Sequence, residues 1–218
     1  MRIDVRKLCV LAMMSALAFI LAAFVRVPVI PVPPLRYDPK DIVILIAGFI
    51  YGPMAAFIVT VVVSFVQMIT VSATGYFGLI MNIISGTAFC CTAAFIYKKK
   101  RTVGGAIFAL VVAVVFATAV MIAWNYVIIP MYTGRARADV IPLLIPAILP
   151  FNLVSNSLNA ALTMLLYKHV KTILQKMNMM PPAEATGERK GLNIGVIAAS
   201  LFVVLTCVIW YLMIRGIL

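Results

Sequence analysis

The stretch Leu110-Val111-Val112-Ala113-Val114-Val115-Phe116 decides the fold class, because seven consecutive apolar residues leave no polar face. A membrane-spanning β-strand alternates apolar and polar residues over about ten positions, and here both alternations are apolar. The surrounding run, 104–128, carries no charged residue and exceeds the roughly 20 residues that a helix needs to cross the hydrocarbon core. The stretch therefore predicts a transmembrane α-helix.

Six further apolar runs repeat this pattern along the chain. Apolar residues make up 65% of the sequence and charged residues 11%, against about 25% charged in soluble domains, which excludes a soluble fold. The first run is long for the apolar part of a signal peptide, so we expect an uncleaved helix. The predicted helices span 8–25, 39–52, 53–72, 78–97, 104–128, 143–168 and 192–214. They predict an all-α membrane protein with a six-helix transmembrane core and an additional C-terminal transmembrane helix.

The second predicted helix, 39–52, is too short to span the membrane. At 1.5 Å per residue it rises about 21 Å, against a hydrocarbon core of about 30 Å. It must be buried among its neighbours, or the loop before it must dip into the membrane. That loop, 26–37, holds four prolines and is expected to be extended. We expect Asp38 to be the N-cap of the helix, with Pro39 at its first position.

The positive residues gather on one side of the predicted helices. If the N-terminus is cytoplasmic, twelve Lys and Arg residues lie inside and six outside, so the positive-inside rule predicts this orientation in a multi-pass protein of the cell (plasma or inner) membrane. We expect a six-helix membrane domain over 1–172, a polar cytoplasmic linker over 173–191, and the extra transmembrane helix over 192–218. The net charge of +12 belongs to these flanking residues and requires the lipid bilayer, not nucleic acid, as partner.

Residue types that carry out chemistry are missing from the predicted spans. Ion-coupled carriers usually keep a charged side chain at mid-membrane, and none lies well inside a span here. The sequence contains no phosphate-binding loop and no zinc-binding helix motif, and its four cysteines lack metal-site spacing. We therefore expect no catalytic residue, no metal site and no enzymatic activity.

Neutral polar side chains do occur in the spans, and they fall on helical faces. One stripe at i, i+3, i+4 and i+7 consists of Asn152, Ser155, Asn156 and Asn159; two others are Thr60, Ser64, Gln67 and Asn82, Ser85, Gly86; Asn125 stands alone. Amides buried in hydrocarbon are costly unless each finds a partner. One interpretation is bonding between helices. The other is a pocket for a polar, uncharged ligand beside the aromatic residues Tyr76, Phe77, Trp124, Tyr126 and Tyr132.

Five short motifs between residues 5 and 172 resemble one known family. In order they are Leu35-Arg36-Tyr37-Asp38-Pro39-Lys40-Asp41, Gly48-Phe49-Ile50-Tyr51-Gly52-Pro53, Gly78-Leu79-Ile80-Met81-Asn82, Asn125-Tyr126 with Pro130-Met131-Tyr132, and Leu149-Pro150-Phe151-Asn152. Together they are similar to the riboflavin-specific S components of energy-coupling factor (ECF) transporters. The resemblance implies a membrane subunit that captures riboflavin at the extracellular side as a transported ligand and uses no cofactor.

The resemblance also implies partners and site residues. A transmembrane coupling protein and two cytoplasmic ATPase subunits would supply the energy, and Ala12 and Ala16, in an Ala-x-x-x-Ala pattern, would contact the coupling protein. Asn125 and Asn152 are expected to hydrogen-bond the flavin ring, and Ser155 stands where relatives often carry a lysine. The full set of candidate substrate-binding residues is Tyr37, Asp41, Gln67, Asn82, Asn125, Asn152, Ser155 and Asn156.

Other functions stay open from the sequence. Within the family, a phosphorylated flavin (FMN) or another vitamin is the alternative ligand. A membrane-embedded enzyme would need an acidic metal-binding cluster, and Asp38 with Asp41 is too small a set. A stand-alone facilitator or structural subunit is a third class, which the flavin absorbance of the purified protein would separate from the first.

Overall fold

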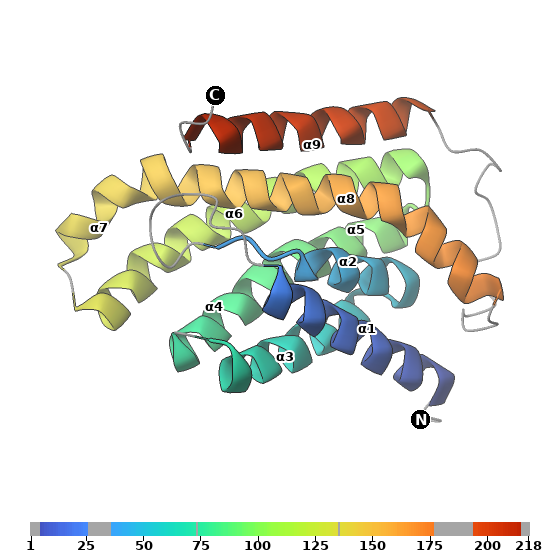
Figure 1. Cartoon of the computed structure of the whole chain (residues 1–218), viewed down its shortest axis with the longest axis horizontal. Helices are drawn as coiled ribbons and strands as arrows, with labels where there is room; N and C mark the ends of the chain where they lie inside the picture. The colour runs from blue at the N-terminus through green and yellow to red at the C-terminus, as the bar shows by residue number, and fades with distance from the viewer. Residues whose placement is uncertain (1–4, 26–35, 73, 135, 177–193, 215–218) are drawn as a thin grey trace.

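The chain folds into a bundle of helices, seen in a computed structural model that describes residues 5–25, 36–72, 74–134, 136–176 and 194–214 (Figure 1). The helices are α1 (Val5–Phe24), α2 (Lys40–Tyr51), α3 (Pro53–Thr70), α4 (Gly75–Gly86), α5 (Thr92–Lys99), α6 (Val103–Thr133), α7 (Arg137–Leu143), α8 (Leu149–Lys176) and α9 (Ile194–Ile214), with π-helical turns η1 (Thr87–Cys91) and η2 (Leu144–Ile148). The prolines of the loop before α2 and residues 177–191 of the predicted linker lie outside the described residues.

All seven predicted helices are present, so the predicted fold class is confirmed. The helix expected at 78–97 is the continuous run of α4, η1 and α5, and the helix expected at 143–168 is the run of α7, η2 and α8. The second run starts at Arg137, six residues early, and extends to Lys176. Prolines recur there at 142, 146 and 150, and each removes one backbone donor. The π-helical turn η2 lies where these donors are missing, which keeps the run helical.

The predicted end of α6 was also wrong. The helix continues past Ile128 through Pro130 and ends at Thr133, where Gly134 adopts φ +70° and its N–H bonds the Pro130 carbonyl. A glycine in the left-handed region is a common helix stop. The helix therefore continues through the proline.

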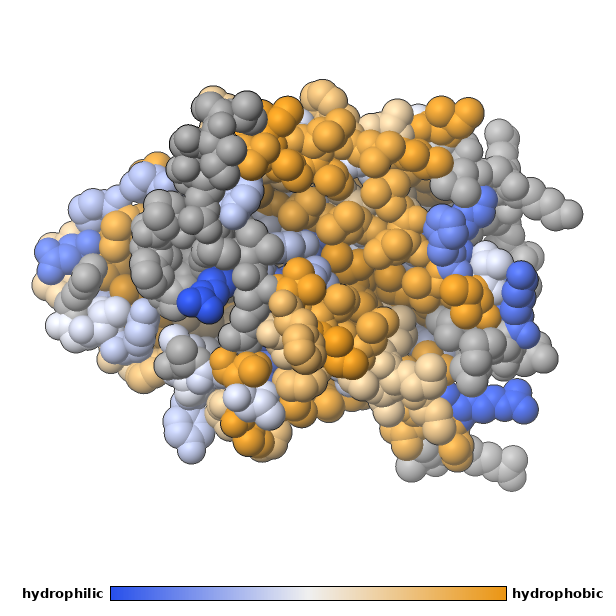
Figure 2. Space-filling view, in the orientation of Figure 1, coloured by the Kyte–Doolittle hydropathy of each residue, from blue (hydrophilic) through white to orange (hydrophobic). Residues whose placement is uncertain are grey.

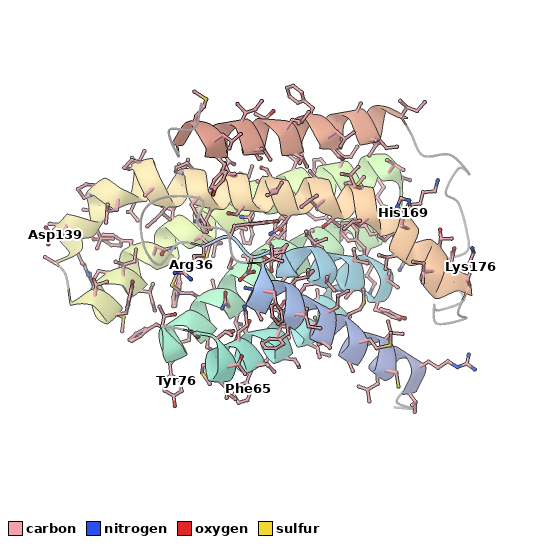
Figure 3. The ribbon with its side chains drawn as sticks, viewed as in Figure 1. Arg36, Phe65, Tyr76, Asp139, His169 and Lys176 are labelled. Atoms are coloured by element: carbon pink, nitrogen blue, oxygen red, sulfur yellow. The ribbon has the colours of Figure 1, made fainter. Side chains whose placement is uncertain are left out.

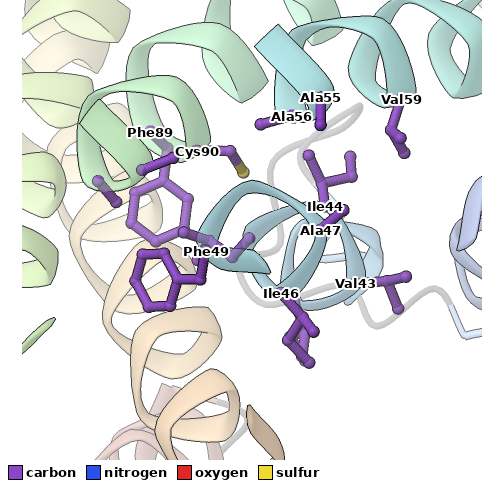
Figure 4. Packing of buried hydrophobic residues seen from close by; sticks show 14 of the residues in the cluster. Val43, Ile44, Ile46, Ala47, Phe49, Ala55, Ala56, Val59, Phe89 and Cys90 are labelled. Carbon is purple, nitrogen blue, oxygen red and sulfur yellow. The ribbon is translucent and has the colours of Figure 1, made fainter. Parts of the chain in front are cut away.

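Helix α2 lies inside the bundle, as its short length requires. Eleven of its twelve residues, Lys40 to Ile50, are buried, and α1, α3, α5 and α8 pack around it. We expected either burial of this short helix by its neighbours or a preceding loop that dips into the membrane, and burial is observed. A helix that is apolar on every side needs such enclosure, and Figure 4 shows Val43, Ile44, Ile46 and Phe49 pointing outward from α2 in several directions.

The predicted cap of α2 was wrong by one residue. Pro39 occupies the N-cap position, without a side-chain hydrogen bond to the helix. The carboxylate of Asp38 instead contacts the side chain of Lys40. The Asp38 side chain is therefore bonded to Lys40 and does not cap the helix.

The outer surface fits a lipid bilayer. Six segments among the described residues are long and apolar enough to cross a membrane: Val5–Phe24, Pro53–Thr70, Gly75–Lys99, Val103–Thr133, Arg137–Val170 and Ile194–Met213. Figure 2 shows a broad apolar band across the middle of the molecule, with hydrophilic residues toward both ends. The chain is a membrane protein with α2 enclosed by its spans.

Helix α9 packs against α8 (Figure 1). Its Ser200 and Cys207 are buried, whereas Leu201, Phe202 and Leu205 between them are exposed. Ser200 and Cys207 are seven residues apart, so one narrow stripe of the helix meets α8. The remaining surface of α9 is apolar and suits lipid.

Gly48 lets three helices approach closely, which generates a stability prediction. A Cβ at position 48 would lie 3.0 Å from Cβ of Ala56 in α3 and 3.0 Å from Cβ of Ala94 in α5. We expect Gly48→Val to destabilise the protein by about 1–3 kcal/mol through overpacking, measured as a lower melting temperature in detergent. Gly104→Val is the control, because nothing lies within 4 Å of a Cβ there. Equal melting of both variants would contradict the close approach at Gly48.

Candidate ligand-binding site

A cavity of about 440 Å³ opens among α2, α3, α4, α6 and α8. This volume lies within the range of about 300–1,000 Å³ that is typical of small-molecule sites. The eight candidate substrate-binding residues all line it: Tyr37, Asp41, Gln67, Asn82, Asn125, Asn152, Ser155 and Asn156. The structure thus brings together residues that are up to 119 positions apart in the sequence (156 − 37), and their role in binding remains a prediction.

Tyr37 connects the segment before α2 to α8. Its hydroxyl donates a hydrogen bond of 2.8 Å to Oδ1 of Asn159, and both side chains are buried. Burial raises the pKa of the Tyr37 phenol, and the nearby carboxylates of Asp41 and Asp38 raise it further. The phenol therefore keeps its proton and acts as a donor, which assigns the Asn159 oxygen to this bond.

Lys40 forms a buried polar bridge at the cavity wall. Its Nζ lies 3.2 Å from each carboxylate oxygen of Asp38 and donates to Oδ1 of Asn82 at 3.0 Å. Lys40 is 5% exposed, so this ammonium depends on its protein partners for the bonds that water would otherwise provide. The bridge joins the start of α2 to the middle of α4.

Four polar atoms of the cavity residues are buried without a hydrogen-bond partner. Two are acceptors, Oδ1 of Asp41 and Oε1 of Gln67; one is a donor, Nδ2 of Asn156; the fourth, Oγ of Ser155, can do either. Each such atom costs roughly 1–3 kcal/mol, and most buried polar groups in proteins are paired. Four further such atoms, on Ser64, Thr87, Thr118 and Trp124, lie outside the cavity lining, whereas these four can bond a polar ligand that enters the cavity.

Asn125 and Asn152 are partly satisfied within their own helices. Nδ2 of Asn125 donates to the Met121 carbonyl at 2.7 Å, and Nδ2 of Asn152 donates to the Ile148 carbonyl at 2.8 Å. Each amide uses one hydrogen in this way and keeps its oxygen and second hydrogen for other partners. Both predicted contacts to a ligand stay chemically available.

Aromatic rings form part of the cavity wall. Phe77 of α4 and Tyr132 of α6 lie 6.1 Å apart between ring centroids, and Phe151 of α8 also lines the cavity. The expectation was wrong for three other rings, since Tyr76, Trp124 and Tyr126 are not among the lining residues. Tyr76 is 77% exposed and points away from the bundle in Figure 3.

Sequence reasoning missed several lining residues. Lys40 was predicted to lie in the helix over 39–52 and was not among the candidate residues, although a lysine in the first turn of an otherwise apolar helix is a signal that could have placed it at the site. Asn159 was placed on the correct stripe but not in the site. Arg36 lies at the exposed side of the cavity (Figure 3). Among the described residues, no group of His, Cys, Asp and Glu side chains could hold a metal ion.

Ala12 and Ala16 lie on the outside of α1. Both are exposed, whereas Ser15 and Ala18 on the other side of the helix are buried. The two alanines are four residues apart and share one face. That face is free to meet another helix.

Comparison with known proteins identifies similar chains. The family profile of the substrate-specific component of ECF transporters matches residues 6–167. The riboflavin transporter RibU of Staphylococcus aureus is 30% identical over 179 residues, covering 79% of this chain and 94% of that protein. The riboflavin transporter FmnP of Bacillus subtilis is 30% identical over 182 residues, covering 79% and 95%. A solved structure, the S component of a bacterial ECF transporter, superposes with a TM-score of 0.69 at 30% identity, covering 79% of this chain and 99% of the other.

The Tyr37–Asn159 bond generates a prediction about the ligand-free protein. We expect Tyr37→Phe to destabilise it by about 1–3 kcal/mol, because the buried Oδ1 of Asn159 loses its donor. Thermal unfolding in detergent measures this change. Tyr76→Phe removes the same hydroxyl from an exposed ring and should leave the melting temperature unchanged. If the two variants melt together, the bond does not hold the start of α2 to α8.

Proposed function

The chain belongs to the substrate-specific (S) components of ECF transporters, and we propose that it captures riboflavin in the cavity among α2, α3, α4, α6 and α8. An S component is a transporter subunit and not an enzyme. The observation that carries the proposal is the set of four unpartnered polar atoms beside aromatic rings in one cavity. The names of the similar proteins, riboflavin transporters in two bacteria, support the choice of ligand.

Riboflavin offers chemical groups that match this cavity. Its isoalloxazine ring is planar and carries both donors and acceptors along one edge, and its ribityl chain carries hydroxyls. The acceptors on Asp41 and Gln67 can take hydrogen bonds from N–H or O–H groups, and Nδ2 of Asn156 can donate to a ring carbonyl. Phe77 and Tyr132 offer faces for ring packing. The ligand would thus satisfy groups that the protein leaves unpaired.

Uptake by this chain requires partners. The sequence contains no phosphate-binding loop, so the energy must come from elsewhere. We propose a transmembrane coupling protein and two cytoplasmic ATPase subunits as those partners. The exposed alanines Ala12 and Ala16 are proposed to meet the coupling protein, because small side chains allow two helices in a membrane to approach closely.

The proposed setting is the cell membrane, with the N-terminus in the cytoplasm. Twelve of the eighteen Lys and Arg residues lie on the cytoplasmic side in this orientation. Exposed Lys98, Lys99, Lys100 and Arg101 connect α5 to α6 at that side. The cavity would then open toward the outside. Residues 1–172 would form the binding domain, 173–191 the linker, and α9 an added membrane anchor.

Flavin binding tests the proposal directly. The purified protein should quench riboflavin fluorescence on titration, and Gln67→Ala should weaken the affinity by about five- to 150-fold, since a ligand donor then loses its acceptor. Gln175→Ala removes the same side chain from an exposed position on α8 and should leave the affinity unchanged.

Two outcomes would contradict riboflavin capture in this cavity. If the purified protein shows no flavin absorbance and does not quench riboflavin fluorescence, riboflavin is not its ligand. Equal affinities of the Gln67→Ala and Gln175→Ala variants would move the binding site elsewhere.

Docking of the coupling protein is tested by enlarging Ala12 and Ala16. Replacing both with Leu should abolish cellular riboflavin uptake, because the added side chains hold a partner helix away. Riboflavin binding by the isolated subunit should persist. Ala198 and Ala199 of α9 are also exposed small residues, and replacing both with Leu should preserve uptake. Loss of binding in the first double variant would indicate folding damage and remove the support for a docking face.

A further inference from the structure

Four charged side chains line the cavity, and they differ in their surroundings. Arg36 is exposed, so water weakens its field. Lys40 and Asp41 are only 5% and 8% exposed, and the side chain of Asp38 is 20% exposed. The three buried or half-buried charges therefore dominate the electrostatics of the cavity interior.

The charge of Lys40 is already balanced. Its ammonium contacts both oxygens of Asp38 at 3.2 Å and donates to Asn82 at 3.0 Å. An ammonium can only donate, so the atom of Asn82 at this contact is the oxygen, and the Nδ2 group is left to donate elsewhere. Lys40 thus fixes the orientation of a cavity amide while it neutralises Asp38.

Asp41 is the less compensated carboxylate: burial raises its pKa to about 6, and the Lys40 ammonium opposes that rise without forming an ion pair with it. Its Oδ1 is buried and has no hydrogen-bond partner, although the neighbouring residue is a lysine. A carboxylate in this position demands a hydrogen-bond donor from whatever enters the cavity. A hydroxyl or an imide N–H supplies one. A phosphate ester, which carries between one and two negative charges near neutral pH, supplies oxygens and repels the carboxylate instead.

We propose that Lys40 and Asp41 together make the site select the uncharged vitamin over its phosphate ester, with Lys40 as a positioning residue and Asp41 as the group that rejects the anion. This inference rests on the proposed riboflavin function and deepens it. Specificity of this kind arises from an unfavourable contact with the wrong ligand as well as from favourable contacts with the right one. The contact is inside the protein, so added salt screens it little.

The test compares the affinities of riboflavin and FMN for the same purified protein by fluorescence quenching. The native protein should bind riboflavin at least about tenfold more tightly than FMN. Asp41→Asn keeps the shape of the side chain and removes its charge, and should lower the riboflavin-to-FMN affinity ratio by about tenfold. Asp139→Asn makes the same charge change at an exposed site in α7, outside the cavity lining (Figure 3), and should leave the ratio unchanged.

Lys40→Met gives a second test, in which the riboflavin-to-FMN affinity ratio should change in the opposite direction to that of Asp41→Asn. Without the ammonium, Asp38 and Asp41 both lose their nearby positive charge, so the ratio should rise by about tenfold. If Lys40 only stabilises the fold, both affinities fall by the same factor and the ratio stays constant. That result would overturn the positioning role.

The remaining outcomes separate this inference from the proposed function. If the native protein binds neither flavin, the proposed riboflavin function and the selectivity inference are both overturned. If it binds riboflavin but FMN equally well or better, Lys40 or Arg36 holds the phosphate, and only the selectivity inference falls. An Asp41→Asn variant that binds riboflavin with the native ratio would overturn the inference in the same way, while riboflavin capture stands.

Discussion

The enclosure of α2 is the constraint on which the rest of the structure depends. This helix rises about 18 Å over twelve residues, well short of the surrounding spans, so its N-terminal end lies part-way along them. Space remains beyond that end, and the cavity occupies it, lined by the first turn of α2 and by neighbouring helices that continue past it. The polar residues Lys40 and Asp41 are tolerated in a buried helix because they sit at this end. The partial positive charge of the helix N-terminus also favours the carboxylate of Asp41 there.

Buried polar groups of the interior find hydrogen bonds in different ways. Thr60 and Thr163 each donate to the carbonyl four residues earlier in their own helix, and this local bonding lets them sit in an apolar bundle without outside partners. The cavity residues Asp41, Gln67, Ser155 and Asn156 have no such solution. In a membrane no solvent reaches the interior from the side, so these groups depend on whatever enters the cavity for their hydrogen bonds. Asn125 and Asn152 combine the two, because each makes a bond within its own helix and also lines the cavity.

Much of the fold could be predicted from the sequence, because twenty or so apolar residues in a row have few alternatives to a transmembrane helix. The end of α6 and the start of the run from α7 to α8 could not be predicted, since prolines such as Pro130 and Pro146 are compatible both with the end of a helix and with its continuation. Of the polar stripes, the one with Asn152, Ser155, Asn156 and Asn159 lines the cavity in full, because helical periodicity fixes which side chains share a face. Periodicity says nothing about which atom of an amide is already bonded, as at Asn125, or that Lys40 turns inward and not toward water.

The π-helical turn η1 lies between α4 and α5 within one membrane span. The half before it lines the cavity, and the half after it packs in the core. The half before it contributes Phe77, Asn82 and Ser85 to the cavity, and the half after it buries Ala93, Ala94 and Tyr97 in the core. Such a turn holds one more residue than an α-helical turn would, and each residue advances the face of an α-helix by about 100°. The extra residue therefore sets the register of the two halves independently. The cavity wall and the packed core are therefore built on the same span with separate facings, so that a change of residue in the first half need not alter the face that the second half packs.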